Sequence, residues 1–362
     1  MVEKQIGFCP ELLICPGETL EEVLDDRDMS RKELAIRSGV TEKHISQVIN
    51  GKASITSDFA SALESALDID AEFWLNLQAN YDLERIECSK KETVTKEELG
   101  ISKQLNEIRK YLVKIGFVPD GTDNCENAIL LRNYAKVTRL DAIPRLQHCA
   151  AYRISTHTNI NPYVLFMWQK LCIDITAPRQ STFALDKKLL SESIPLIRSL
   201  VKLNINESIP QLKEIFDKCG ITFAIVKNFK GAPVQGYIEK NETGGLILCM
   251  TIRNSYADIF WFTLFHEIAH ILYDDIAKIY FDYTFEDNEI ENRADQFASE
   301  VLIPTALYKR FVEEREFSLN AIRSFSKKAD IPCFIVIGRL QKEKYIPYTW
   351  YSGEKLRYKW ES

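Results

Sequence analysis

The 362-residue sequence lacks the features that mark membrane and secreted proteins. Its most apolar stretch, residues 259–273, is too short to span a bilayer and contains two histidines and a glutamate. Residues 1–16 include acidic side chains and no long apolar run, so we expect no signal peptide. Nine cysteines are present, an odd number, and no two form the C-x-x-C pair of a thiolate zinc site. We therefore expect reduced thiols, a cytoplasmic location and no membrane partner.

The composition has no strong bias and no internal repeat. Apolar residues make up 46% of the chain and charged residues 27%, which is typical of soluble globular proteins. The length predicts two or three domains. A net charge of −6 argues against a protein that coats nucleic acid non-specifically, but it leaves room for a small DNA-reading surface.

The first segment, residues 20–84, has the pattern of short helices separated by turns. The apolar spacing predicts helices at residues 19–24, 33–36, 44–49, 59–67 and 73–83. Ser30 and Thr41 are predicted N-caps, and the first is expected to complete a capping box with the glutamate three residues later. Gly39 and Gly51 are predicted helix ends.

Residues 30–51 combine two of these helices with a tight turn between them. The small Ala35 and Gly39 allow close approach, and Val40 and Ile45 are expected to point inward. In a helix-turn-helix the second helix lies in the major groove. We therefore predict that double-stranded operator DNA is contacted by Arg31, Lys32, Thr41, Lys43, His44, Gln47 and Asn50.

The charge pattern of this region supports a local nucleic-acid contact. Residues 27–52 hold six basic and three acidic side chains, a local balance of +3. Such a stripe fits a groove-binding surface with modest non-specific affinity. The alternative is that these are interaction helices that have lost DNA binding.

Three further segments, at residues 16–20, 55–56 and 72–83, complete a family pattern. With them, residues 16–84 resemble the Cro/repressor-type helix-turn-helix domain of HigA-type antitoxins. The resemblance implies a five-helix DNA-binding domain, which we place at residues 16–87. It also implies repression of its own operon as a homodimer, and a cognate toxin as a possible partner.

The middle of the chain carries no recognisable chemistry. Residues 88–99 are polar and are predicted to be a linker, and residues 100–195 are predicted to be mainly helical, with a loop at 116–124. His148 and His157 have no partner at ligand spacing, so a structural or surface role is favoured for both.

From residue 220 onward, β-rich runs alternate with turns and are followed by helices. Strands are predicted at residues 221–226, 234–238 and 245–251. Helices are predicted at residues 256–274, 287–304, 318–328 and 332–342. The whole chain is therefore predicted to be mainly α with a small β-sheet.

The first of these helices contains the H-E-x-x-H motif His266-Glu-Ile-Ala-His270. Residues four apart lie on one helix face, so both imidazoles can bind one ion, and neutral imidazole suits zinc. Glu267 can polarise a zinc-bound water. The alternative, a core helix with accidental polar residues, would bury two histidines and a glutamate, which is unfavourable without partners.

A catalytic zinc needs a third protein ligand and an open position. No histidine follows His270, so a carboxylate is expected, and the next helix offers several. We predict Glu291 as the ligand, Asp295 as the partner of a ligating histidine, and Glu289 as the fallback ligand. Glu300 is expected at the surface. The alternative is that this face is an ordinary solvated acidic stripe.

The H-E-x-x-H motif followed by residues 291–304 resembles the ImmA/IrrE family of metallopeptidases. The resemblance covers about residues 195–345 and implies an α+β zincin-like domain, which we place at 196–345, followed by a tail at 346–362. The stretch Arg293-Ala-Asp295 departs from the commoner Glu-Ala-Asn form, which leaves a supporting role for the aspartate in place.

This second resemblance implies that His266, His270 and Glu291 bind Zn2+ and that Glu267 is the general base. The expected function is a DNA-binding regulator with a zinc endopeptidase that cleaves a regulatory protein or this chain itself. The alternative is a non-catalytic repressor or antitoxin whose zincin-like domain senses a ligand or holds a partner. Because the two domains are fused, we also expect regulation in cis, in which the middle region transmits a signal or blocks the zinc cleft.

Two details of substrate binding are also expected. Strand 245–251 precedes the motif helix, and an edge strand at this place can pair with an extended peptide. Tyr280 and Tyr283 are candidates for stabilising an oxyanion, although a packing role is favoured for each.

Overall fold

The computed structural model describes residues 14–146, 151–154, 160–241, 244–252, 255–275 and 288–358, with the backbone alone for residues 87, 88, 151–154 and 288. The chain divides into two compact units, one of residues up to 99 with 121–130, the other of residues 100–120 with 131 onward. Expectations about residues 1–13, His148, His157, Tyr280 and Tyr283 lie outside the described part. Within the described part, no helix is both long and apolar enough to cross a membrane.

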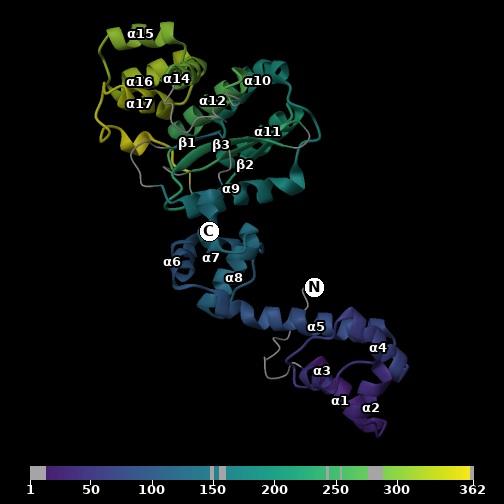
Figure 1. Cartoon of the computed structure of the whole chain (residues 1–362). Coiled ribbons are helices and arrows are strands. Elements are labelled where there is room, and N and C mark those ends of the chain that lie inside the picture. Colours follow the sequence, from purple (N-terminus) through teal and green to yellow (C-terminus); the bar gives the residue numbers. More distant parts are fainter. Residues whose placement is uncertain are drawn as a thin grey trace. The chain divides into compact units, whose positions relative to one another are not determined.

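The first unit contains a bundle of five helices, as the sequence predicts. They are α1 (Pro16–Asp26), α2 (Arg31–Ser38), α3 (Glu42–Ile49), α4 (Ser57–Leu67) and α5 (Ala71–Ser89) (Figure 1). Each contributes to one apolar core, whose fully buried members include Leu20, Leu34, Ile45, Leu63 and Trp74. Burial of such side chains, at about 1.5–3 kcal/mol each, stabilises helices that are too short to persist alone.

Helix ends in this unit follow the expected capping residues. Ser30 Oγ and Thr41 Oγ1 each accept the backbone N–H three residues later, at 3.1 and 3.2 Å. Gly39 follows the end of α2 with φ +71°, a left-handed conformation that favours glycine. The expected capping box also requires the Glu33 carboxylate to accept from the Ser30 backbone N–H, and that prediction is wrong. The carboxylate accepts from Arg37 at 2.7 Å instead.

The segment predicted as a polar linker, residues 88–99, is largely helical. After α5, a 3₁₀ turn (Lys90–Thr93) leads into α6 (Lys96–Gln104). Thr95 and Glu98 form a reciprocal capping box, in which each backbone N–H donates to the other side chain at 3.3 and 3.2 Å. The polar residues here begin a helix rather than solvate a loop.

Residues 100–195 are mainly helical, as predicted, apart from one strand. The helices are α7 (Asn106–Lys114), α8 (Asn124–Ala135), α9 (Pro162–Thr176) and α10 (Lys187–Ser199), with 3₁₀ turns at Leu140–Arg145, Ala177–Arg179 and Leu200–Lys202. The strand β1 (Ala151–Ile154) pairs with β3 of the second unit. Residues 131–195 all belong to that unit, so the expected boundary at 195 does not separate two compact bodies.

Four strands form one mixed sheet in the order β1-β3-β4-β2. β2 (Ile221–Ile225), β3 (Val234–Lys240) and β4 (Leu246–Met250) occupy the three predicted β-rich runs. β4 pairs parallel to β2 and antiparallel to β3, so it lies inside the sheet. The expectation that this strand is an edge that receives a peptide is therefore wrong.

Helices cover both faces of this sheet (Figure 1). α9 lies on one face, where Trp168 packs edge-on against Tyr237 of β3 at 5.7 Å, and α12 (Ala257–Leu272) lies on the other. The remaining helices are α11 (Ile205–Lys218), α14 (Asn288–Leu302), α15 (Thr305–Glu313), α16 (Leu319–Ala329) and α17 (Cys333–Lys342). α15 was not predicted, and the others match predicted segments where a prediction was made.

The segment after α17 was predicted as a tail, but its described part packs onto the start of α12. The Tyr358 hydroxyl accepts from Trp261 Nε1 at 2.9 Å, and both side chains are buried. Lys355 pairs with Asp258 at 2.8 Å, with little of either side chain exposed. A short 3₁₀ turn (Ser352–Glu354) lies between α17 and these contacts. The segment is therefore part of the core that holds α12.

Arg198 of α10 ties together the ends of two other helices. Its guanidinium donates to the carbonyl groups of Val301 and Leu302 at the end of α14, at 2.8 and 3.1 Å. It also donates to those of Ala329 and Asp330 at the end of α16, at 2.8 and 3.3 Å. A helix leaves its last carbonyl groups unpaired, and a cation there satisfies them. α10 therefore fixes the helix that carries the predicted third ligand.

Candidate functional site

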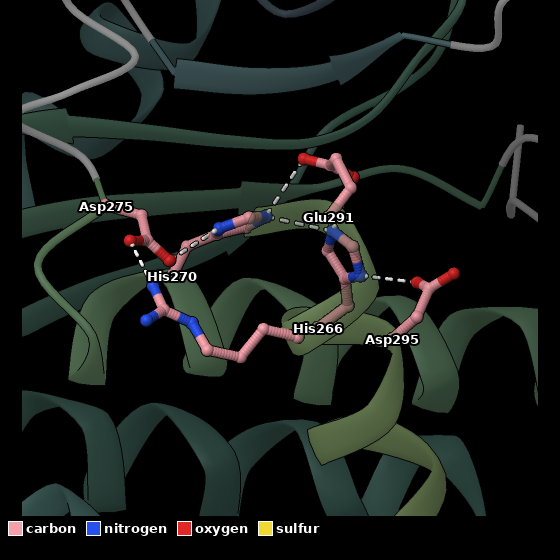
Figure 2. A network of polar contacts seen from close by, with 6 residues as sticks. His266, His270, Asp275, Glu291 and Asp295 are labelled. Atoms are coloured by element: carbon pink, nitrogen blue, oxygen red, sulfur yellow. Dashed lines mark hydrogen bonds and ion pairs between the residues drawn. The ribbon is translucent and has the colours of Figure 1, made fainter. Parts of the chain in front are cut away.

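Helix α12 holds the two histidines of the H-E-x-x-H motif in the interior of the second unit. His266 and His270 are 0% and 4% exposed, and they share a helix face because they lie one turn apart. Their Nε2 atoms approach to 2.9 Å (Figure 2). Two buried ring nitrogens at this distance are close enough to be ligands of a single ion.

Glu291 of α14 places its carboxylate beside the Nε2 atoms of both histidines. Its two carboxylate oxygens lie 3.2 Å from His266 Nε2 and 3.4 Å from His270 Nε2 (Figure 2). Burial raises the pKa of the Glu291 carboxyl, but the hydrogen bonds with both histidines outweigh burial and hold its pKa well below the usual range. The carboxylate therefore stays ionised at neutral pH, as a metal ligand must.

The geometry of these three side chains fits a zinc-sized ion. Zinc bound tetrahedrally at about 2.0–2.1 Å requires ligand atoms about 3.3 Å apart. The two Nε2 atoms lie 2.9 Å apart, and their nearest Glu291 oxygens, a different one for each histidine, lie at 3.2 and 3.4 Å, close to that value. His266, His270 and Glu291 thus form a possible metal-binding triad. Three protein ligands leave one tetrahedral position open, as in catalytic sites.

Each histidine is backed by a carboxylate on its other ring nitrogen. Asp295 Oδ1 lies 2.7 Å from His266 Nδ1, which is the partnership expected for Asp295 (Figure 2). Asp275 Oδ2 lies 3.5 Å from His270 Nδ1 without a hydrogen bond between them, and its other oxygen accepts from Arg293 Nη2 at 2.6 Å. A hydrogen-bonded partner such as Asp295 fixes the tautomer and orientation of a ligating imidazole.

Asp275 and Arg293 were not predicted to serve the site. Asp275 is fully buried, three residues after the last residue of α12, and no motif marks it. Arg293 was noted only as a departure from the family pattern, yet its guanidinium holds Asp275 and lies 4.4 Å from the Tyr273 ring. The available signal was an acidic residue directly after an apolar helix, which is weak by itself.

Glu267 lies between the histidines in sequence and is 2% exposed. Strand β3 passes directly against it, because a Cβ on Gly236 would lie only 2.3 Å from Glu267 Oε1. Because Gly236 has no side chain, the strand can contact this carboxylate. The arrangement places a potential base, the residue after His266, against a strand backbone.

The other acidic candidates of α14 lie elsewhere. Glu289 is exposed at the start of the helix, and Glu291 rather than Glu289 reaches the histidines. Glu300 is exposed and accepts the Thr305 N–H at 2.8 Å, as fits a surface residue. Because Glu291 and Asp295 turn toward His266, the reading of this face as a solvated acidic stripe does not describe it.

In the first unit, the predicted DNA-contacting residues separate into two groups. Lys32, Lys43 and Gln47 are exposed, and among the described residues their side chains form no hydrogen bond or ion pair. Thr41 is exposed, but its hydroxyl caps α3. The other three side chains have partners within the unit. Arg31 forms an ion pair with Glu21, the His44 ring packs against the Phe59 ring with 5.2 Å between centroids, and Asn50 donates to the Ser46 carbonyl at 2.6 Å.

The local positive charge is partly neutralised within the first unit. Arg31 and Arg37 form ion pairs with glutamates, and Arg27 donates to the Leu67 carbonyl. The remaining cations of the predicted stripe are the lysines at 32, 43 and 52, all exposed. The surface that can meet phosphates is therefore smaller than the count of basic residues suggests.

Comparisons with known proteins match both ends of the chain. A model described as helix-turn-helix matches residues 20–74, and one described as the IrrE N-terminal-like domain matches residues 256–323. The uncharacterized HTH-type transcriptional regulator YbaQ of Escherichia coli is 34% identical over 100 residues, which are 27% of this chain and 83% of YbaQ.

Two further matches also cover the N-terminal part. Virulence-associated protein A' of Dichelobacter nodosus is 38% identical over 79 residues, 21% of this chain and 69% of that protein. A solved structure of an addiction module antidote protein of the HigA family from Coxiella burnetii is 36% identical. The match covers 23% of this chain and 96% of the antidote protein, with a TM-score of 0.21.

Proposed function

Because the chain belongs to the family of helix-turn-helix transcriptional regulators and also carries an IrrE N-terminal-like domain, we propose that it is a DNA-binding regulator with a zinc-dependent endopeptidase site. The observation that carries the proposal is the triad of His266, His270 and Glu291 with Glu267 beside it. Each histidine also has a carboxylate behind it, which a merely structural polar cluster does not need.

In the proposed mechanism, His266, His270 and Glu291 would hold the ion through two nitrogens and one oxygen. A zinc ion bound there would supply Lewis-acid chemistry that lowers the pKa of a water molecule, so that the water can lose a proton and attack a peptide carbonyl at neutral pH. Glu267 would accept the proton of the attacking water and give it to the leaving amine. Asp295 and Asp275 keep both imidazoles turned toward the ion.

In the first unit, the proposal assigns sequence reading to the exposed side of α3. Gln47 can form paired hydrogen bonds with a base edge, and Lys32 and Lys43 can meet phosphates. Arg31, His44 and Asn50 are assigned mainly to the fold, because their side chains already have partners there. A homodimer on the operator and a cognate toxin stay predictions of the sequence resemblance.

Metal content tests the site before any substrate is known. Elemental analysis of the purified, zinc-reconstituted chain is expected to give about one zinc per chain. Glu291→Ala should lose that zinc, whereas Glu289→Ala, an exposed glutamate on the same helix, should keep it. Absence of zinc in the reconstituted wild type would favour the non-catalytic alternative, a DNA-binding regulator with a relic peptidase fold.

Catalysis is then tested with Glu267→Gln, which keeps the volume of the side chain and removes its basicity. This variant should hold zinc like the wild type and fail to cleave a mixed peptide library analysed by mass spectrometry. Cleavage by Glu267→Gln at the wild-type rate would refute the assignment of the base.

A further inference from the structure

Strand β3, which passes the proposed base Glu267, has backbone groups that do not pair with β4. Thr251 N–H donates to the Gln235 carbonyl at 2.9 Å, so the backbone groups of Gln235 point toward β4. Backbone groups alternate in direction along a strand, so those of Gly236 and Ile238 point away from β4. Gly236 is also the residue whose backbone lies against Glu267. The polar groups of β3 nearest the base are therefore turned to the side opposite β4.

A peptide that is to be cleaved beside Glu267 would lie on this side of β3. Extended peptides bind proteins by adding a strand to a sheet, with backbone hydrogen bonds giving affinity. The position is taken by β1, which pairs antiparallel with β3 through Ala151 opposite Ile238 and Tyr152 opposite Tyr237 (Figure 1). The pairing then shifts and resumes with Ile154 opposite Val234, so residue 153 of β1 faces two residues of β3, Gln235 and Gly236.

We propose that residues 151–154 occupy the position of an extended peptide substrate on β3, so that this chain shields its own peptidase site until another peptide displaces them. The inference rests on the proposed function and names the surface through which that site receives its substrate. It also replaces β4 with β3 as the strand that binds peptide.

The short and irregular pairing of β1 with β3 fits a segment that another peptide can displace. β1 has four residues against seven in β3, so part of β3 has no partner on this side within the described residues. The irregular register next to Gly236 interrupts the ladder where the base lies. A longer extended peptide that pairs regularly along β3 can form more backbone hydrogen bonds than β1 does.

Hydrogen exchange of the full-length protein tests the occupancy without any need for activity. In the wild type, the Ile238 amide should be protected, because Ile238 pairs with Ala151. In Ala151→Pro this amide should exchange at least about tenfold faster, because the substitution removes the N–H that faces Ile238. Tyr152→Pro is the matched control, since its N–H points away from β3 and proline is tolerated there on an edge strand. The Tyr237 amide, which points to β4, should not change in either variant.

An Ile238 amide that keeps its protection in Ala151→Pro would overturn the proposal. So would an unprotected Ile238 amide in the wild type, a result that does not depend on whether the variant folds.

Peptide binding separates this inference from the proposed catalysis. The probe is a labelled synthetic peptide of residues 147–158 of this chain, added to proteins that also carry Glu267→Gln. Ala151→Pro should bind it at least about tenfold more tightly than Tyr152→Pro. Equal binding by the two variants counts against the inference.

Cleavage is measured with the same peptide and the zinc-loaded proteins that retain Glu267. Tight binding to Ala151→Pro with no cleavage supports the inference and refutes the peptidase. Equal cleavage by the wild type and both proline variants refutes the inference and leaves the peptidase intact.

Discussion

The triad of His266, His270 and Glu291 and the exposed side of α3 differ in how their side chains are held. Around the triad, a carboxylate lies behind each histidine and Arg293 lies behind one of those carboxylates. On α3 and α2, by contrast, Gln47, Lys43 and Lys32 are exposed without polar partners among the described residues. A site that binds an ion needs its ligands oriented in advance, whereas a DNA-reading side chain is ordered by the DNA that it meets.

The same contrast sorts the residues within the first unit. His44 and Asn50 have the residue types expected of base readers, but their contacts with Phe59 and Ser46 are those of core and capping residues. In the second unit, side chains held by polar neighbours are therefore the candidate ligands. In the first unit, side chains held by neighbours are the weaker candidates for reading DNA.

Removal of a ligand should have the largest effect. His270→Ala should lower zinc affinity by more than the roughly 100-fold that loss of an outer partner produces, because a direct bond to the ion is lost. It should also lower the melting temperature of the zinc-loaded protein toward that of the metal-free protein. Competition with a fluorescent chelator and calorimetry measure the two effects. A variant with wild-type affinity would exclude His270 as a ligand.

Arg198→Met tests how far the support of the triad extends through the second unit. Loss of four charge-assisted hydrogen bonds should lower the free energy of unfolding by about 2–4 kcal/mol. Arg198→Lys should recover only part, because an ammonium cannot replace the planar fork. Arg179→Met, at an exposed arginine, is the control. Denaturant unfolding followed by tryptophan fluorescence reports the difference, and equal midpoints for Arg198→Met and Arg179→Met would contradict it.

Loss of the partner of one histidine should have an intermediate effect. Asp275→Asn should weaken zinc binding about 10- to 100-fold, because it removes the negative charge beside His270 and the charged acceptor of Arg293. Asp295→Asn should fall in the same range. If only Asp295→Asn weakens binding, the contact of Asp275 with His270 serves stability alone, and a matching loss in unfolding free energy would show it.

The smallest effect is expected on the exposed side of α3. Gln47→Ala should lose about 1–2 kcal/mol of discrimination between the operator and unrelated DNA without a change in melting temperature. His44→Ala should do the reverse, since its ring packs on Phe59. Gel shifts over a salt series and thermal unfolding measure both. Loss of specificity in His44→Ala with unchanged stability would return His44 to the reading surface.

Much of the fold could be predicted from local patterns. The first five helices, β2, β3, β4 and the motif helix follow from apolar periodicity and turn residues, which depend only on near neighbours in the sequence. α6 was also within reach, because Thr95 and Glu98 have the spacing of a capping box.

The failures depend on contacts between distant residues. Arg198 meets carbonyl groups more than a hundred residues away, and the pairing of Asp275 with Arg293 exists only once α14 lies beside α12. β1 is too short to show a period, and its partner begins 80 residues later. For the candidate site, the sequence predicted the three triad residues, Glu267 and Asp295, but not the strand that faces them.

The division of the chain into two units has a consequence for any cut in β1. Residues 100–120 belong to the second unit, where Leu105, Ile108 and Leu112 are buried and Gln104 accepts from Asn161 at 2.6 Å. A nick at residues 151–154 would leave these residues on the N-terminal fragment. The two fragments would therefore stay joined non-covalently, and release of the N-terminal fragment would require a separate dissociation step after hydrolysis.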